Sequence, residues 1–201
     1  MHFLHFLSPL PLVSVALASG LTLPADAREG FGIQLWSDDG SQLYIHESQF
    51  EQYNITIQPG VPDPLPSGIA IAPTATATVG SLVRRGSPIT CLRGTEVFVP
   101  ELHDGLIYFA DNLGCGTTYN SNRFASYKNV ALIRWQGSTV LYTCNYSGAD
   151  RVWSGPSLVS IIEQVFNYCN QQGVAAWYYD SYRQVSWGYT NRANGYCGPA
   201  Q

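Results

Sequence analysis

Charged side chains are scarce in this sequence, and the few present are nearly balanced in sign. Its 201 residues include 10 Lys and Arg against 14 Asp and Glu, so charged residues make up 12% of the chain. Proteins that bind nucleic acid neutralise phosphates with a basic patch or stripe, and the sequence contains no run of basic residues. We therefore expect no nucleic-acid partner.

Motifs that carry catalysis or bind a cofactor are also missing. The sequence has no P-loop, no Rossmann glycine pattern and no G-x-S-x-G elbow, and its cysteines lack the C-x-x-C pairs of a zinc site. After residue 85 the one histidine is His103, flanked by Glu101 and Asp104, and we interpret it as a surface residue. The acidic residues show no spacing that selects a glycosidase pair. We predict a protein without metal, cofactor or catalytic site.

Long apolar runs are missing except near the amino end. Residues 7–18 form an apolar stretch that is too short to span a bilayer and is followed by small residues. This pattern indicates a signal peptide over residues 1–18, and a second A-x-A site allows cleavage as late as residue 27. We expect a secreted, extracellular protein with no stable membrane anchor.

The cysteines lie in the later part of the chain, and in an exported protein they meet an oxidising compartment. Five cysteines allow two disulfide bonds and one left over: Cys91, Cys115, Cys144, Cys169 and Cys197. We expect Cys91 to pair with Cys197, because a bond between them would join the two ends of the domain. Cys115 and Cys169 would join two helices, with Cys144 left unpaired or exchanged into one of these bonds.

Proline content and a dibasic pair divide the chain before the first cysteine. Most of the acidic excess lies before Arg84, where alternating pieces at 31–36 and 43–45 suggest a hairpin, which is marginal on its own. A Pro/Thr/Ala-rich linker follows and ends at Arg84 and Arg85, a pair that kexin-type proteases cut. We predict a largely unstructured acidic pro-segment and linker over 19–85 and a mature disulfide-bonded domain over 86–201. The sequence leaves open whether the cut pro-segment stays bound.

The pattern after residue 85 predicts an α+β domain. Apolar residues at helical spacing predict helices near 102–113 and 157–169, with Ser154 or Ser157 as the cap of the second. Alternating residues predict hairpins from 129–135 with 139–146 and from 174–179 with 184–189, and a short strand near 89–92. We expect an antiparallel sheet of about four or five strands with both helices on one face. Alternate residues of the last hairpin should be buried, so about half of its aromatic residues would be free to stack on sugars.

Two further motifs bear on modification and on a possible enzyme. Asn54 and Asn145 begin N-glycosylation sequons. The segment 148–152 resembles a segment of the small fungal guanyl-specific ribonucleases, in which the arginine, here Arg151, helps bind the scissile phosphate. Those enzymes also need histidines around the sheet, and no histidine follows Arg151 in this sequence.

Five parts of the predicted domain carry a family resemblance: the stretch 89–95 around Cys91, residues 142–146 around Cys144, the helix within 155–173, the strand 184–189 and the closing Cys197. In these parts the domain resembles the fungal killer-toxin and effector group, which includes the virally encoded killer toxin of smut fungi and the necrosis-inducing effectors of plant-pathogenic fungi. The resemblance implies an α/β-sandwich without enzymatic activity. It implies a secreted toxin or virulence effector that binds a cell-surface or host protein target. The residues leave two alternatives open: a small hydrolase such as a ribonuclease, and a cell-wall or carbohydrate-binding protein.

Overall fold

The computed structural model describes residues 21–55, 89–112, 127, 129–148, 154–169 and 173–197. The fold is α+β, with one antiparallel sheet and two α-helices. The strands, in chain order, are β1 (Gly30–Trp36), β2 (Gln42–His46), β3 (Ile89–Glu96), β4 (Asn129–Gln136), β5 (Thr139–Asn145), β6 (Val174–Asp180) and β7 (Val185–Asn191). The helices are α1 (Val99–Asn112), α2 (Gly155–Tyr168) and the short 3₁₀ helix η1 (Glu47–Gln49).

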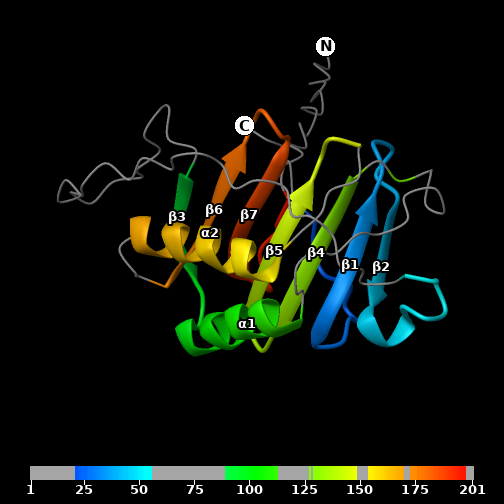
Figure 1. Cartoon of the computed structure of the whole chain (residues 1–201), viewed down its shortest axis with the longest axis horizontal. Coiled ribbons are helices and arrows are strands. Elements are labelled where there is room, and N and C mark those ends of the chain that lie inside the picture. Colours follow the sequence, from blue (N-terminus) through cyan, green and yellow to red (C-terminus); the bar gives the residue numbers. More distant parts are fainter. Residues whose placement is uncertain are drawn as a thin grey trace, which may run out of the picture.

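The seven strands form a single sheet in the order β2-β1-β4-β5-β7-β6-β3, as Figure 1 shows. Every neighbouring pair is antiparallel. The hairpins β4–β5 and β6–β7, which the sequence predicts, are the inner strands between β1 and β3. The strand β3 adds to the edge beside β6, where the ladder is irregular after Leu92.

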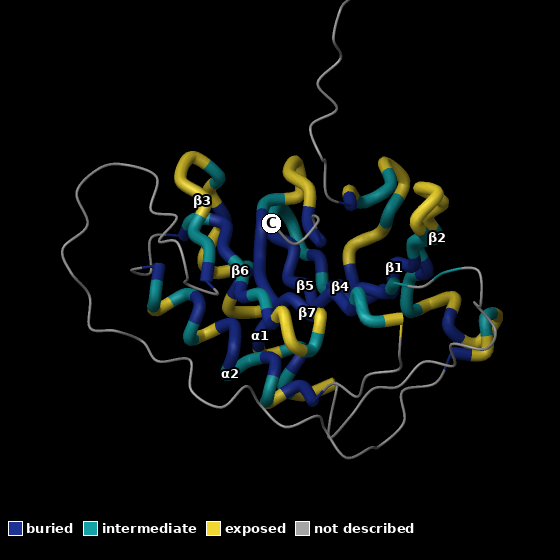
Figure 2. Tube along the Cα trace, turned by 90° about the horizontal axis from the view of Figure 1, so that it is seen from above, coloured by how far each residue is buried: buried dark blue, intermediate teal, exposed yellow. Residues whose placement is uncertain are grey.

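Both helices lie on the same face of the sheet, α1 against β4 and β5 and α2 against β6 and β7. The α1 side chains that face the sheet include Leu102, Leu106 and Phe109, which recur at helical spacing and are all buried. On α2 the matching stripe consists of Leu158, Ile161, Ile162 and Val165. In Figure 2 the buried residues concentrate in the strands and on the helix sides next to them, while the exposed residues lie mainly at the turns.

The start of α2 is fixed by its cap and by a close approach to α1. Ser154 is the N-cap, and its side chain accepts a hydrogen bond from the Ser157 amide, with proline in the first turn. A Cβ built on Gly155 would lie 1.9 Å from the carbonyl oxygen of Phe109. Glycine is therefore the residue that lets the two helices meet here.

The hairpin β1–β2 is an integral part of the sheet, which corrects the expectation of a largely unstructured segment before Arg85. β1 pairs with β4 along its whole length, from Gly30 opposite Trp135 to Trp36 opposite Asn129. Phe31, Ile33 and Leu35 are each only 1% exposed and belong to the same core as α1. Fully burying such a side chain contributes about 1.5–3 kcal/mol. These three residues therefore contribute on the order of 4–9 kcal/mol, comparable to the net stability of a whole domain.

These two strands also explain why the sheet has more strands than the sequence predicts. The predicted four or five strands correspond to β4–β7 with the short strand β3, and β1 and β2 make up the difference. The structure has one sheet with helices on one face, and the killer-toxin-like sandwich stays a prediction. The predicted signal peptide and linker, and Arg84, Arg85, Cys115 and Arg151, lie outside the described residues.

The disulfide pairing differs from the one expected. Cys91 pairs with Cys169 and Cys144 with Cys197. Cys91 lies on the edge strand β3 and faces the helices, where Cys169 forms the C-cap of α2. Cys144 lies in the middle of the sheet on β5, and the chain after β7 returns across it to bring Cys197 into reach. The two ends of the predicted domain are therefore held at different places on the sheet.

Candidate functional site: the aromatic face of the sheet

The face of the sheet opposite the helices is lined with aromatic residues. Trp135 and Tyr142 are buried in it, and the partly exposed aromatic side chains on the same face include Trp36, Tyr44, Tyr146 and Trp177. They share one face because side chains alternate along each strand and the antiparallel pairs are in register.

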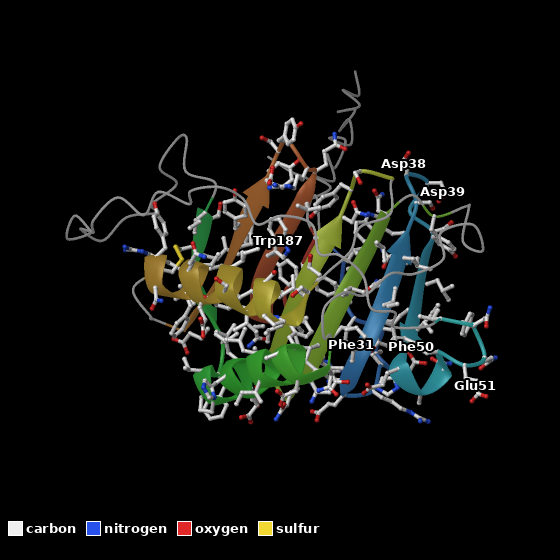
Figure 3. All side chains as sticks on the ribbon, in the orientation of Figure 1. Phe31, Asp38, Asp39, Phe50, Glu51 and Trp187 are labelled. Atoms are coloured by element: carbon white, nitrogen blue, oxygen red, sulfur yellow. A yellow bond between two sulfur atoms is a disulfide. The ribbon has the colours of Figure 1, made fainter. Side chains whose placement is uncertain are left out.

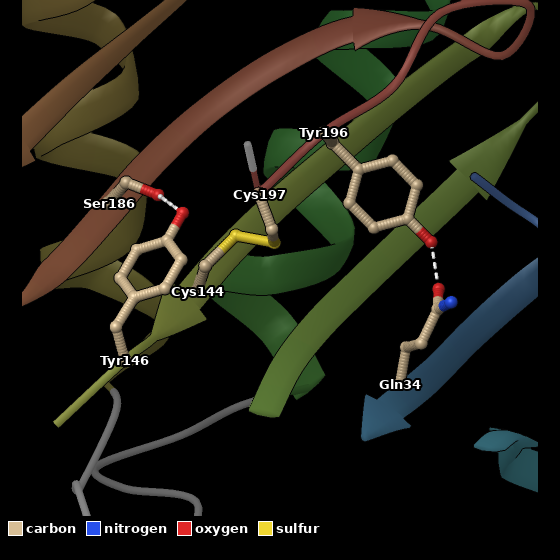
Figure 4. The surroundings of a disulfide bond; sticks show 6 residues. All are labelled: Gln34, Cys144, Tyr146, Ser186, Tyr196 and Cys197. Atoms are coloured by element: carbon tan, nitrogen blue, oxygen red, sulfur yellow. Dashed lines mark hydrogen bonds between the residues drawn. A yellow bond between two sulfur atoms is a disulfide. The ribbon is translucent and has the colours of Figure 1, made fainter. Parts of the chain in front are cut away.

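Two segments cross part of this face. Leu21 and Tyr196 form an isolated β-bridge, in which the Tyr196 amide donates to the Leu21 carbonyl at 2.8 Å. Tyr196 also donates a hydrogen bond from its hydroxyl to the Gln34 side chain, and the Cys144–Cys197 bond lies beside it (Figure 4). The face is therefore covered near Gln34 and Cys144 by residues from the two ends of the described chain.

Beside this cover, three rings from distant parts of the sequence form a row. Trp36 at the end of β1 meets Tyr146 after β5 edge-on, with ring centroids 5.9 Å apart. Tyr146 in turn meets Tyr179 on β6 at 6.1 Å. The Tyr146 and Ser186 hydroxyls are hydrogen-bonded at 3.1 Å, which fixes the central ring (Figure 4). All three rings are partly exposed, so the row offers aromatic surface to a ligand. We call Trp36, Tyr146 and Tyr179 the aromatic row.

Two tyrosines of this face, Tyr44 and Tyr146, are neutral at physiological pH. Burial raises the pKa of Tyr146 to about 12, although its hydrogen bond with Ser186 acts in the opposite direction. Burial, and to a lesser degree the nearby Glu47 carboxylate, raises the pKa of Tyr44 to about 12. The two phenols are therefore uncharged hydrogen-bonding groups attached to apolar rings.

In the last hairpin, β6–β7, the aromatic residues are divided between the two faces of the sheet. Tyr178, Trp187 and Tyr189 are buried on the helix side of the sheet. Trp177 and Tyr179 lie on the opposite face and are partly exposed, and Tyr182 in the turn is 94% exposed. The expectation that about half of these residues are buried is confirmed. A Cβ on Gly188 would lie 2.6 Å from the Cβ of Trp177, so this glycine makes room for the Trp177 side chain.

A cluster of polar side chains that the sequence did not predict, Glu47, Tyr108 and Arg134, lies near the start of β1. Glu47 accepts a hydrogen bond from the Phe31 amide at 3.2 Å and another from the Tyr108 hydroxyl at 2.5 Å. The Arg134 guanidinium lies over the Tyr108 ring, 4.3 Å from its centroid. Burial, aided by the hydrogen bond to Glu47, raises the Tyr108 pKa. Both Glu47 oxygens already have partners, which indicates a structural role for this carboxylate.

The turn between β4 and β5 is held by two further carboxylates. Glu29 accepts from the Gly137 amide at 2.9 Å, and Glu101 accepts from the Ser138 and Thr139 amides at 2.8 and 3.1 Å. These bonds satisfy amides at a turn where Gly137 has a φ of +54°, a conformation that favours glycine. The same bonds give Glu101 a structural role at this turn. His103, which Glu101 flanks in the sequence, is exposed on α1.

The two sequons lie in different surroundings. Asn54 is exposed after the 3₁₀ helix, whereas Asn145 is fully buried at the end of β5. The Asn145 side-chain oxygen accepts hydrogen bonds from both the amide and the hydroxyl of Ser147. A glycan needs an exposed asparagine amide, so the fold favours Asn54 over Asn145 as its carrier.

Within the described ranges, no group of three or more His, Cys, Asp or Glu side chains is arranged to hold a metal ion. In the same part of the chain, no helix is long and apolar enough to cross a bilayer.

The sequence predicts the aromatic row only in part, because strand alternation places Tyr146 and Tyr179 on strand faces but does not bring Trp36 beside them. No family model, no curated protein and no solved structure matches this chain.

Proposed function

We propose that the protein is a secreted toxin or effector that acts by binding a target on competing or host cells, and that the aromatic row is its contact surface. The observation that carries the proposal is the aromatic row, in which Trp36, Tyr146 and Tyr179 contact one another on the face of the sheet without helices. Tyr and Trp dominate the energetics of protein interfaces because they bury much apolar area and keep a polar group. The resemblance to killer toxins and effectors supports the biological setting.

The hydrogen-bonded carboxylates at the other end of these strands also favour binding over chemistry. The carboxylates Glu29, Glu47 and Glu101 accept hydrogen bonds from backbone amides, a hydroxyl or both, so they position the chain. The row itself consists of aromatic side chains on three strands or strand ends of one sheet, which hold the rings at fixed spacing. A rigid surface loses little conformational entropy when it binds.

A test compares cell binding of the wild type with a Tyr179→Ala variant. We expect this variant to lose at least about tenfold in affinity for susceptible fungal or plant cells, as for an interface hot spot. Tyr182→Ala, which removes the same side chain from the exposed turn outside the row, serves as the matched control. Equal binding by Tyr179→Ala and wild type, with both folded by circular dichroism, would contradict the proposal.

A second candidate function is carbohydrate binding, and the same rings favour it. Aromatic faces stack on sugar rings, and all three rings of the row are partly exposed on one face of the sheet. Incubation with insoluble chitin and with β-glucan separates the two candidates. Sedimentation with a polysaccharide that depends on Tyr179 supports the second candidate, whereas cell binding without polysaccharide binding supports the first. Incubation with RNA tests the ribonuclease alternative, with Arg151→Ala as the control.

A further inference from the structure

We propose that residues 21–55 are a permanent part of the folded protein, so that cleavage after Arg85 yields a two-chain protein held together without a covalent link. Hydrolysis there would consume one water and leave a carboxylate on Arg85 and an amine on Gly86. We call the fragment that ends at Arg85, of which the structure describes residues 21–55, the N-terminal piece, and residues 86–201 the C-terminal piece. The proposal answers a question that the sequence leaves open, whether the segment before the cut stays bound.

The first support is backbone pairing inside the sheet. β1 of the N-terminal piece lies between β2 and β4, and it pairs with β4 of the C-terminal piece from one end to the other. Removing the N-terminal piece would leave the amides and carbonyls of β4 unpaired along one edge. An exposed apolar strand edge is an aggregation site, and β4 contains the buried Val130, Leu132 and Ile133.

The second support is the shared core. Phe31 of the N-terminal piece packs against the ring of Phe109 on α1, with centroids 6.4 Å apart. Phe50, after the 3₁₀ helix, meets Phe31 at 5.8 Å, and Figure 3 shows the two side chains close together near η1. In the same view Asp38, Asp39 and Glu51 lie on the outer turns of the piece. The N-terminal piece therefore has an apolar inner side and an acidic outer side, as a part of a globular domain does.

The third support is a set of side-chain bonds that join the two pieces at both ends of β1. At one end the Tyr108 hydroxyl donates to Glu47, and the Gly137 amide donates to Glu29. Toward the other end the Tyr196 hydroxyl donates to Gln34. These contacts reach the N-terminal piece from α1, from the β4–β5 turn and from the chain after β7, so no single hinge would free it.

The link between the pieces is noncovalent by necessity. The sequence has no cysteine before Cys91, so no disulfide within this chain can cross the cut. Leu21 is buried and bridges to Tyr196, so signal cleavage after residue 18 keeps this contact and cleavage after residue 27 removes it. We therefore expect the N-terminal piece to begin near residue 19. The aromatic row contains Trp36 from one piece and Tyr146 and Tyr179 from the other, so the proposed binding surface also depends on retention.

The test uses the full chain, purified with its disulfides intact and then cut with a kexin-type protease. A second variant carries a site-specific protease sequence between Arg85 and Gly86, so the result does not depend on natural processing. We expect both pieces to co-elute in equal amounts on gel filtration in high salt, and native mass spectrometry to give their summed mass. Separation of the N-terminal piece from a C-terminal piece that stays monomeric and cooperatively folded would overturn the proposal.

A matched pair of substitutions locates the contact. Ile33→Asp places a charge at a buried β1 position, and Gln52→Asp places the same charge at an exposed position in the same piece. An unpaired buried charge is strongly unfavourable, so Ile33→Asp should lower the retained fraction of the N-terminal piece by at least about tenfold, whereas Gln52→Asp should leave it unchanged. Equal retention of the two variants would also overturn the proposal.

Discussion

The substitution Phe31→Ala tests whether the segment before the dibasic pair belongs to the core. Phe31 is 1% exposed and contacts three rings, those of Phe50, Tyr108 and Phe109, at centroid distances of 5.8, 6.2 and 6.4 Å. Truncating a buried phenylalanine to alanine costs about 3–5 kcal/mol, because the transfer free energy is lost and a cavity remains. That loss is a large fraction of the roughly 5–15 kcal/mol that stabilises a domain.

The assay is urea unfolding followed by tryptophan fluorescence, on the uncut chain with Arg84→Gln and Arg85→Gln to prevent processing. With a slope of about 2–3 kcal/mol per molar urea, Phe31→Ala should lower the midpoint by roughly 1–2 M. Phe98→Ala is the matched control, because Phe98 is 56% exposed and its truncation leaves little cavity. A midpoint for Phe31→Ala that equals that of Phe98→Ala would refute the assignment of β1 to the core.

Three further predictions concern the disulfides, alkaline pH and the helix contact. Peptide mapping without reduction should recover Cys144 linked to Cys197, and loss of this bond should cost about 4 kcal/mol for a sequence separation of 53; a Cys91–Cys197 peptide would contradict the fold. The pKa of Tyr146 is raised to about 12 in the folded protein, so its contribution to stability is fully present below the unfolded pKa near 10. It is lost as the pH rises through 12. An alkaline titration followed by phenolate absorbance should show that Tyr146→Phe removes one group that titrates above the usual tyrosine range. If the group that this substitution removes titrates near pH 10, Tyr146 is not buried as described. Gly155→Ala should destabilise by about 1–3 kcal/mol, because its Cβ would meet the Phe109 carbonyl, and an unchanged melting temperature would show that the helices lie further apart.

Local patterns in the sequence predict the elements after residue 85 well. The apolar stripe of α2, its Ser154 cap and the face shared by Val140, Tyr142 and Cys144 all appear in the structure. Each of these features depends on residues within a few positions of one another, so spacing alone is informative. The same logic predicted that about half of the aromatic residues of the last hairpin are buried, as the burial of Tyr178, Trp187 and Tyr189 confirms.

Long-range pairing is what the sequence could not supply. The alternation of Phe31, Ile33 and Leu35 predicts a strand. The sequence around these residues does not show that β4 is the partner strand, because the two strands are far apart in the chain. The acidic composition and the dibasic pair then suggested a largely unstructured pro-segment instead of two strands of the sheet. The disulfide expectation failed for a related reason, since it assumed that the ends of the predicted domain meet.

The aromatic row was predictable only in part. Strand alternation places Tyr179 on the face opposite Tyr178, among the aromatic residues of the last hairpin that stay free of the core. Trp36 contributes only because β1 joins the sheet beside β4 and places its last residue near Tyr146. The row combines residues from both sides of the predicted cleavage point, so it cannot be found when the two parts of the sequence are considered separately.

Hydrogen exchange of the cut protein tests most directly whether β1 remains in the sheet. After cleavage at Arg85, the amides of Gly30–Trp36 should exchange as slowly as those of Asn129–Gln136, because the two strands share one ladder and should open together. Exchange of the β1 amides at the rate of an unstructured peptide, while β4 to β7 stay protected, would contradict the account.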